Sequence, residues 1–181
     1  KNAVVFCVAD GHGSTKLREG VAAGGYECAP IACHVAVAVH GIYDPLHVFR
    51  QCHLAIREKL VIPGSFWEDN VQLIRTQRRK EGETLTHGCT LSILKIHPGR
   101  QSTFSFVGDS LGVWVTSDGT IVPLGRAHGT KNSDEVNRMR VAGVKVSDGY
   151  FQFNAGRSTM RAAVSRSLGH FGIASMLVEP E

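Results

Sequence analysis

The sequence lacks paired cysteines, a strong charge of either sign and any long apolar run, and each absence excludes a class of protein. Its five cysteines are scattered over 181 residues without the short spacings of a zinc site, and the odd number argues against a disulfide framework. Free thiols indicate an intracellular, reducing compartment, with cytoplasm, nucleus and organelle matrix equally compatible. The most apolar helix-like run, 29–39, is too short to span a membrane, and no signal peptide is recognisable.

The charge pattern does not favour nucleic acid as a partner. The net charge is only +4, and the densest basic cluster, 75–80, is short and has no interleaved aromatic residues. Such a cluster is typical of a solvated helix end. At 181 residues the chain is long enough for one domain, and its 43% hydrophobic residues can form a substantial core. The chain begins without Met and ends without a finished element, so we expect residues 1–181 to be a single, incomplete domain.

The residue pattern predicts an α+β fold in which helices pack on antiparallel sheets. Apolar periodicity and capping residues predict helices at 29–40, 44–60, 68–80 and 132–143. Asn132 is expected to cap the last of these, with Glu135 completing a capping box. Short β-branched and aromatic segments predict an antiparallel meander, at 90–96, 103–107, 113–116 and 121–124. Further strands are expected at 144–146 and 150–153, and the glycine-rich segment 14–25 is expected to be a loop or a short helix.

The fold is expected to be organised around one stretch near its start. Residues 4–9 are all apolar and predict a buried strand, which ends in Asp10, Gly11, His12 and Gly13. Asp10 offers hard carboxylate oxygens, and Gly11 lets its carbonyl approach a ligand closely. His12 titrates near neutral pH. This combination suits metal-assisted hydrolysis, and the alternative is a glycine-rich turn that merely ends a strand.

Five blocks, in order and over almost the whole chain, resemble motifs of the metal-dependent Ser/Thr protein phosphatases of type 2C. The blocks are residues 8–13, 87–90, 106–110, 134–143 and 163–169. The terminal residues 178–181 resemble the strand that follows the fifth block in that family. The resemblance implies a four-layer α-β-β-α sandwich of two antiparallel sheets flanked by helices, with two or more Mn²⁺ or Mg²⁺ ions at one end.

The resemblance also implies roles for residues at the matching positions. Asp10 would bridge two cations and Gly11 would give its carbonyl to one of them. His12 would be the general acid, and Asp109 would belong to an additional cation. The implied activity is hydrolysis of phosphoserine and phosphothreonine, with phosphoproteins as substrates. For Asp109 the alternative is ordinary turn chemistry, in which an Asp after Gly caps its own backbone.

His170 stands where the family has an aspartate that ligates metal. A neutral imidazole gives one nitrogen in place of a carboxylate, so as a ligand His170 would favour Mn²⁺, Fe²⁺ or Zn²⁺ over Mg²⁺. The family's upstream arginine and acid, and its late Asp-containing block, do not occur within the sequence. The alternative function is therefore a phosphatase-like protein without activity that acts as a binding or structural subunit of a larger assembly. A hydrolase for small phosphoesters is a third hypothesis.

Other polar residues favour structural roles. Cys89 replaces a serine of the family motif and is expected to be a small buried packing residue. Asp118 is expected to form a plain hairpin turn, and Ser165 and Arg166 to hold local structure. The four histidines of the first two helices are expected at the helix surface or in the core rather than on a metal: His34, His40, His47 and His53.

Overall fold

The protein folds into antiparallel sheets with helices packed against them, which confirms the α+β class. The computed structural model describes residues 3–16, 22–39, 41, 44–60, 87–99, 101–155, 158–170, 173 and 175–181. The helix predicted at 68–80 lies outside this part of the chain. The described helices are α1 (Gly25–Val39), α2 (Pro45–Leu60) and α4 (Ser133–Val141). The strands are β1 (Val4–Val8), β2 (Gly11–His12), β3 (Ser14–Lys16), β4 (Ala22–Gly24), β5 (Gly88–Cys89), β6 (Leu91–Ile96), β7 (Thr103–Val107), β8 (Gly112–Val115), β9 (Ile121–Leu124), β10 (Lys145–Ser147), β11 (Tyr150–Ala155), β12 (Ser158–Ala162) and β13 (Leu168–Gly169).

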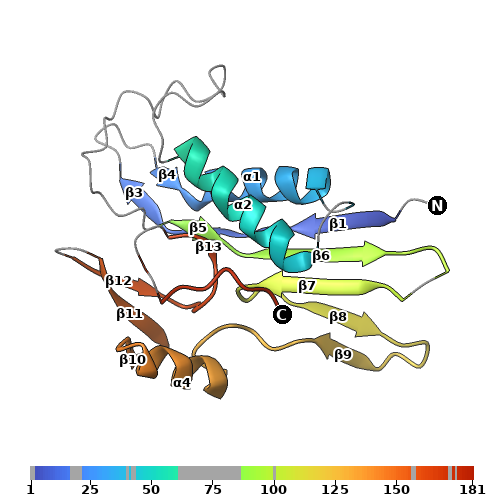
Figure 1. Cartoon of the computed structure of the whole chain (residues 1–181). Coiled ribbons are helices and arrows are strands. Elements are labelled where there is room, and N and C mark those ends of the chain that lie inside the picture. The colour runs from blue at the N-terminus through green and yellow to red at the C-terminus, as the bar shows by residue number, and fades with distance from the viewer. Residues whose placement is uncertain are drawn as a thin grey trace.

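One sheet and two helices form the larger core. Strands β1, β6 and β7 pair antiparallel in that order, with Val4 opposite Ile96 and Leu91 opposite Val107. Helices α1 and α2 lie together on one face of this sheet (Figure 1). Small and large apolar side chains from both layers are fully buried between them, among them Cys28, Ala32, Ala36, Phe49, Cys52, Ile56 and Leu91. Close packing of this kind supplies most of the free energy that holds helices on a sheet.

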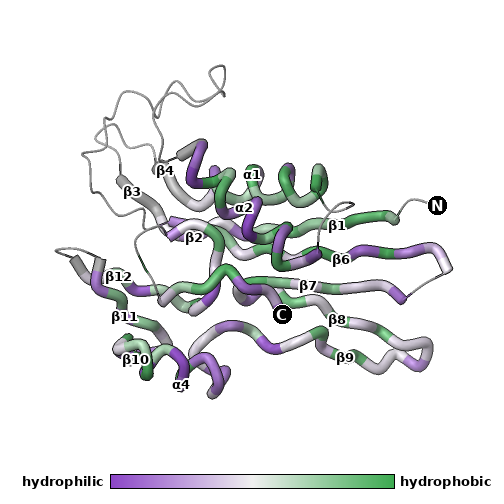
Figure 2. The backbone as a smooth tube through the Cα atoms, in the orientation of Figure 1, coloured by the Kyte–Doolittle hydropathy of each residue, from purple (hydrophilic) through white to green (hydrophobic). Residues whose placement is uncertain are grey.

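The expected burial of the first strand is wrong on one face. Val4, Phe6 and Val8 expose 51%, 54% and 63% of their surface, whereas Val5 and Cys7 pack against the helical core. Strand β1 is apolar along its length (Figure 2), but successive side chains of a strand point to opposite faces. The described residues cover only the face that α1 and α2 occupy.

Both helices begin for identifiable reasons. Helix α2 starts at Pro45 as predicted, because the Asp44 carboxylate accepts the His47 N–H at 2.9 Å. Helix α1 starts at Gly25, ahead of the predicted start, so Pro30 lies inside the helix and not in its first turn. The helix can start early because Gly25 packs directly on β2. A Cβ added to Gly25 would lie 2.0 Å from the His12 backbone nitrogen. Within the described chain no helix is long and apolar enough to cross a membrane.

The predicted meander is interrupted. Strands β6 and β7 form one hairpin and β8 and β9 another, and in the described sheets β7 does not pair with β8. The chain turns away at Gly108, whose φ of 100° takes it out of extended conformation. Residues 14–16 and 22–24 also differ from the prediction, since β3 and β4 pair antiparallel with Ser14 opposite Gly24.

A second, smaller core lies under the last third of the chain. Strands β10, β11 and β12 form an antiparallel sheet, and α4 packs beside it on the side of the molecule away from α1 and α2 (Figure 1). Its buried side chains include Met139, Phe151 and Phe153. The arrangement has helices at both ends of a stack of strands, and the four-layer sandwich in its full form stays a prediction.

Candidate active site

A short sheet joins three of the five sequence blocks. Strand β5 pairs antiparallel with β2 on one side and with β13 on the other, so that Gly88 faces both His12 and Gly169. The close approach depends on the absence of a side chain at Gly88, where an added Cβ would lie 2.1 Å from the Leu168 carbonyl oxygen. Cys89, in the same strand, is a fully buried free thiol whose pKa is raised well above its usual value, chiefly by burial. It is the packing residue that the sequence predicts, not a nucleophile.

Thr90 connects this sheet to the third block, residues 106–110. Its hydroxyl accepts the Asp10 N–H at 3.1 Å, and its own N–H donates to the Asp10 carbonyl at 2.9 Å. The same hydroxyl lies 2.7 Å from the Ser110 hydroxyl. Two turns that lie about a hundred residues apart in the sequence are therefore held against one threonine. Asp10 and Asp109 leave these turns as exposed side chains.

His12 is held by Ser167 of the fifth block and by His170, which directly follows that block. Its Nε2 lies 3.0 Å from the Ser167 hydroxyl, and its Nδ1 lies 3.1 Å from His170 Nε2. The two imidazole rings are nearly parallel, at an angle of 19° with centroids 4.9 Å apart. Both ring nitrogens of His12 are thus engaged by the protein.

Burial lowers the pKa of both histidines, and in His12 nearby carboxylates act against this effect. Burial lowers the pKa of His12, while the negative charges of Asp109 and Asp10 act to raise it. Burial, together with the smaller effects of the imidazoles of His12, His87 and His53, lowers the pKa of His170 to about 3. At neutral pH His170 is therefore uncharged in this arrangement.

His170 occupies a demanding backbone position. Its φ is 52°, in the left-handed region that costs free energy for residues other than glycine. The conformation is held by the His170 N–H, which donates to the His87 carbonyl at 3.1 Å, and by the Gly169 N–H, which donates to His53 Nδ1 at 3.2 Å. His53 comes from α2, and this role could not be predicted, because in sequence a single helix histidine that bonds a distant N–H looks the same as a core histidine.

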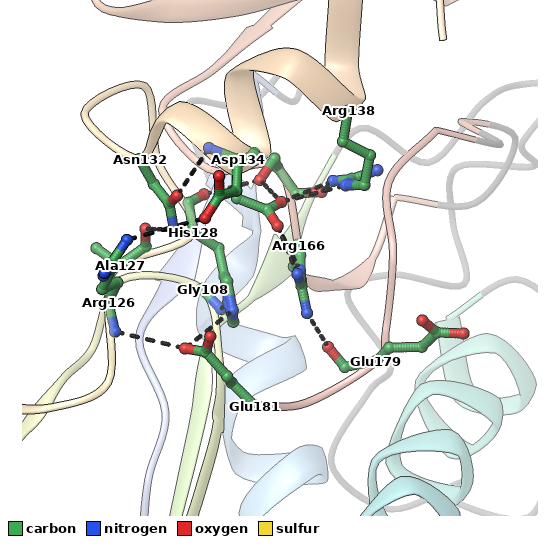
Figure 3. A network of polar contacts seen from close by, with 12 residues as sticks. Gly108, Arg126, Ala127, His128, Asn132, Asp134, Arg138, Arg166, Glu179 and Glu181 are labelled. Atoms are coloured by element: carbon green, nitrogen blue, oxygen red, sulfur yellow. Dashed lines mark hydrogen bonds and ion pairs between the residues drawn. The ribbon is translucent and has the colours of Figure 1, made fainter. Parts of the chain in front are cut away.

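The fourth block, residues 134–143, supplies a buried ionic network (Figure 3). Glu135 is only 3% exposed, and its carboxylate accepts hydrogen bonds from Arg138, Arg166 and the Ser165 hydroxyl. Burial alone would raise the pKa of Glu135, but the bonds from Arg166, Ser165 and Arg138 outweigh it and lower the pKa to about 2. The predicted role of Ser165 and Arg166 in holding local structure is confirmed, and the network ties α4 to the segment that carries Ser167.

The predicted capping box is wrong in one half. Asn132 caps α4 as expected, since its side-chain oxygen accepts the Asp134 N–H at 3.1 Å. Glu135 does not reach back to Asn132, because its carboxylate is engaged by the two arginines. Nearby, the Gly108 N–H donates to His128 Nδ1 at 3.0 Å (Figure 3), which anchors the turn that carries Asp109.

The structure brings all five predicted site residues to one end of the fold, but not around one point. Asp10, Gly11 and His12 lie in one turn, Asp109 in the neighbouring turn, and His170 against His12. Among the described residues, no three His, Cys, Asp or Glu side chains are arranged to hold one metal ion together. The exposed carboxylates of Asp10 and Asp109 are hard oxygen donors that fit Mn²⁺ or Mg²⁺. The ligand roles remain predictions, and Ser167 and His53 are site residues that the sequence did not single out.

Comparison with known proteins connects this geometry to a family. A family model of protein phosphatase 2C matches residues 34–181, which is most of the chain. One similar solved structure, of a C. elegans sex determining protein, has a TM-score of 0.62 and 19% sequence identity. The match covers 99% of this chain and 39% of that chain, so this chain spans well under half of the neighbour's length. No curated protein matches the sequence.

Proposed function

Because the chain belongs to the protein phosphatase 2C family, we propose that its domain hydrolyses phosphoserine and phosphothreonine on proteins with the help of bound Mn²⁺ or Mg²⁺. The observation that supports this most directly is the junction at Thr90. There the turn with Asp10 and His12 and the turn with Asp109 lie against the same side chain. Two carboxylates and an imidazole beside one another suit the hydrolysis of a phosphomonoester.

Each residue has a chemical role in this proposal. Asp10, the Gly11 carbonyl and Asp109 would hold the cations. When bound, such cations neutralise the phosphate and make a water nucleophilic near neutral pH. His12 would give a proton to the departing Ser or Thr oxygen, a contribution of about 10²–10⁴-fold in rate. Burial lowers the pKa of His12, and the negative charges of Asp109 and Asp10 act against that shift.

The test is phosphate release from a phosphothreonine peptide by the intact protein over a series of Mn²⁺ concentrations. Asp10→Asn should lower the rate on the order of 100-fold, because a neutral amide is a poor ligand for these cations. Asp118→Asn is the matched control, since Asp118 is an exposed turn residue that bonds Thr116 and Thr120. Its rate should equal that of the unchanged protein. Absence of Mn²⁺-dependent release from the unchanged protein would exclude the proposal.

A second candidate function is a phosphatase-like subunit of a larger assembly that binds without catalysis. It is favoured by one observation, namely that His170 Nε2 faces His12 Nδ1 and not the carboxylates of Asp10 and Asp109. This function requires stoichiometric incorporation into a complex and no cation uptake. Two bound Mn²⁺ ions per domain in a calorimetric titration would exclude it.

A further inference from the structure

His170 is the one predicted cation ligand that is buried, whereas Asp10, Gly11 and Asp109 are exposed. It is 3% exposed, and its backbone is held in the left-handed region by bonds to the His87 carbonyl and from the Ile173 N–H. Such strained positions are kept where the surrounding structure gains from the side chain placed there. The role of His170 therefore depends on what its ring contacts and on which ring nitrogens of His12 and His170 carry protons.

The contacts of the Ser167 hydroxyl indicate which nitrogen of His12 carries the proton. Its hydroxyl oxygen lies 3.1 Å from the Cys89 carbonyl, 3.0 Å from the Leu168 carbonyl and 3.0 Å from His12 Nε2. A hydroxyl has one proton, and carbonyl oxygens can only accept. The proton is best used toward one of the two carbonyls, so the hydroxyl oxygen presents a lone pair to His12. His12 must then carry its proton on Nε2.

The position of the proton on His12 in turn determines which nitrogen of His170 carries a proton. A neutral imidazole with a proton on Nε2 has a bare Nδ1 that accepts hydrogen bonds. His170 Nε2, at 3.1 Å, must therefore donate to His12 Nδ1. The remaining nitrogen of His170, Nδ1, is buried and has no hydrogen-bond partner among the described residues. His170 Nε2 is thus engaged by His12, and among the described residues His170 forms no group with other His, Cys, Asp or Glu side chains that could hold a metal ion.

We propose that His170 is a positioning residue for His12 and not a cation ligand: its Nε2–H holds His12 in the tautomer that carries the proton on Nε2. A chain of Ser167, His12 and His170 then fixes the ring of the proposed proton donor from both sides. In this arrangement the cations would be held by the oxygen donors alone. The inference rests on the proposed function for its cation-binding part, whereas the tautomer can be measured independently of it.

The experiment uses the intact protein with ¹⁵N-labelled histidine and two readouts, neither of which is activity. Long-range ¹H–¹⁵N spectra at pH 8 report the tautomer of His12, and a calorimetric titration with Mn²⁺ reports affinity. In the unchanged protein His12 should be the Nε2–H tautomer. His170→Asn, which tolerates the left-handed backbone, should give a tautomer mixture at His12 and change the Mn²⁺ affinity by less than about threefold. His170→Gln, whose amide can donate to the same nitrogen, should restore the single tautomer. His97→Asn, a histidine in the turn after β6, should change neither readout.

Two results would overturn the inference. One is an Nδ1–H tautomer for His12 in the unchanged protein, a measurement that does not depend on whether any variant folds. The other is a tenfold or greater loss of Mn²⁺ affinity in His170→Asn with the His12 signals unchanged. If the unchanged protein binds no Mn²⁺, the proposed function fails, and the tautomer measurement still decides the role of His170.

Discussion

Replacing Glu135 by Gln should destabilise the protein more than any other removal of a single charge near the site. The carboxylate is 3% exposed and accepts bonds from Arg138, Arg166 and Ser165. Its pKa falls from 4.5 to about 2 in the folded protein, which corresponds to about 3 kcal/mol in favour of the ionised form. Removing one partner of a buried ion pair typically costs about 3–5 kcal/mol, because the other charge is left uncompensated. We therefore expect Glu135→Gln to lower the free energy of unfolding by about 3 kcal/mol at pH 7.

The pH dependence gives the prediction a second arm. A carboxylate whose pKa is lowered by folding contributes its full stabilisation above its unfolded pKa, near 4.5, and loses it as the pH falls toward the folded value of about 2. The difference between the unchanged protein and Glu135→Gln should thus shrink to about 1.5 kcal/mol at pH 3. Comparing the two proteins at each pH cancels the titration of all other acidic groups.

The assay is urea unfolding of the intact protein at pH 7 and pH 3, followed by circular dichroism. Asp134→Asn is the matched control, because Asp134 is the preceding residue of the same helix and its exposed carboxylate pairs with Arg126 only at 3.8 Å. An exposed pair of this kind is worth about 0.2–1 kcal/mol, so the control should stay within that range. A cost at Glu135 no larger than at Asp134, or a cost that does not fall at pH 3, would refute the reasoning.

Three further outcomes are expected. Gly108→Ala should cost more than about 2 kcal/mol of unfolding free energy in urea titration, because its Cβ would lie 2.4 Å from Thr90 Cγ2 at a φ of 100°; Gly119→Ala, with a similar φ but open space, should cost only about 1 kcal/mol, and equal costs would contradict the packing argument. Gly25→Ala should weaken Mn²⁺ binding at least tenfold by displacing the turn at His12, and unchanged calorimetric affinity would show that the turn tolerates it. Chelation of divalent ions with EDTA should abolish phosphate release, and added Mn²⁺ should restore it; release that persists in EDTA would contradict a cation-dependent site.

Local elements were predictable because their signals are local. The helix at Pro45–Leu60 and the one at Ser133–Val141 are bounded by Asp44 and Asn132, whose side chains accept backbone N–H groups at the predicted ends. The strands at β6, β7 and β9 alternate or cluster β-branched residues between clear turns. In each case the physical cause lies within a few residues of its effect, so one stretch of sequence contains all the information required.

Contacts between distant segments were not predictable from the same reasoning. The Ser167 hydroxyl and His12 are 155 positions apart, and the Gly169 N–H bonds a histidine from α2. Glu135 has the spacing of a capping box, yet its carboxylate bonds two arginines and not the helix end. A buried carboxylate without a charged partner costs more free energy than the loss of a second capping bond. The prediction that β1 is buried on both faces is wrong for a similar reason, because composition cannot show how many layers cover a strand.

The groups that assemble the site contact one another directly and do not require a cation between them. Gly88 allows three strands to meet, Thr90 joins two turns, and Glu135 anchors the segment that carries Ser167. The ring of His170 likewise has its hydrogen-bond partner in His12. Folding stability and cation chemistry are therefore separable in this domain, so a stable, well-folded protein favours neither of the two candidate functions. Cation affinity does separate them, because the phosphatase requires bound Mn²⁺ or Mg²⁺ and the non-catalytic subunit requires none.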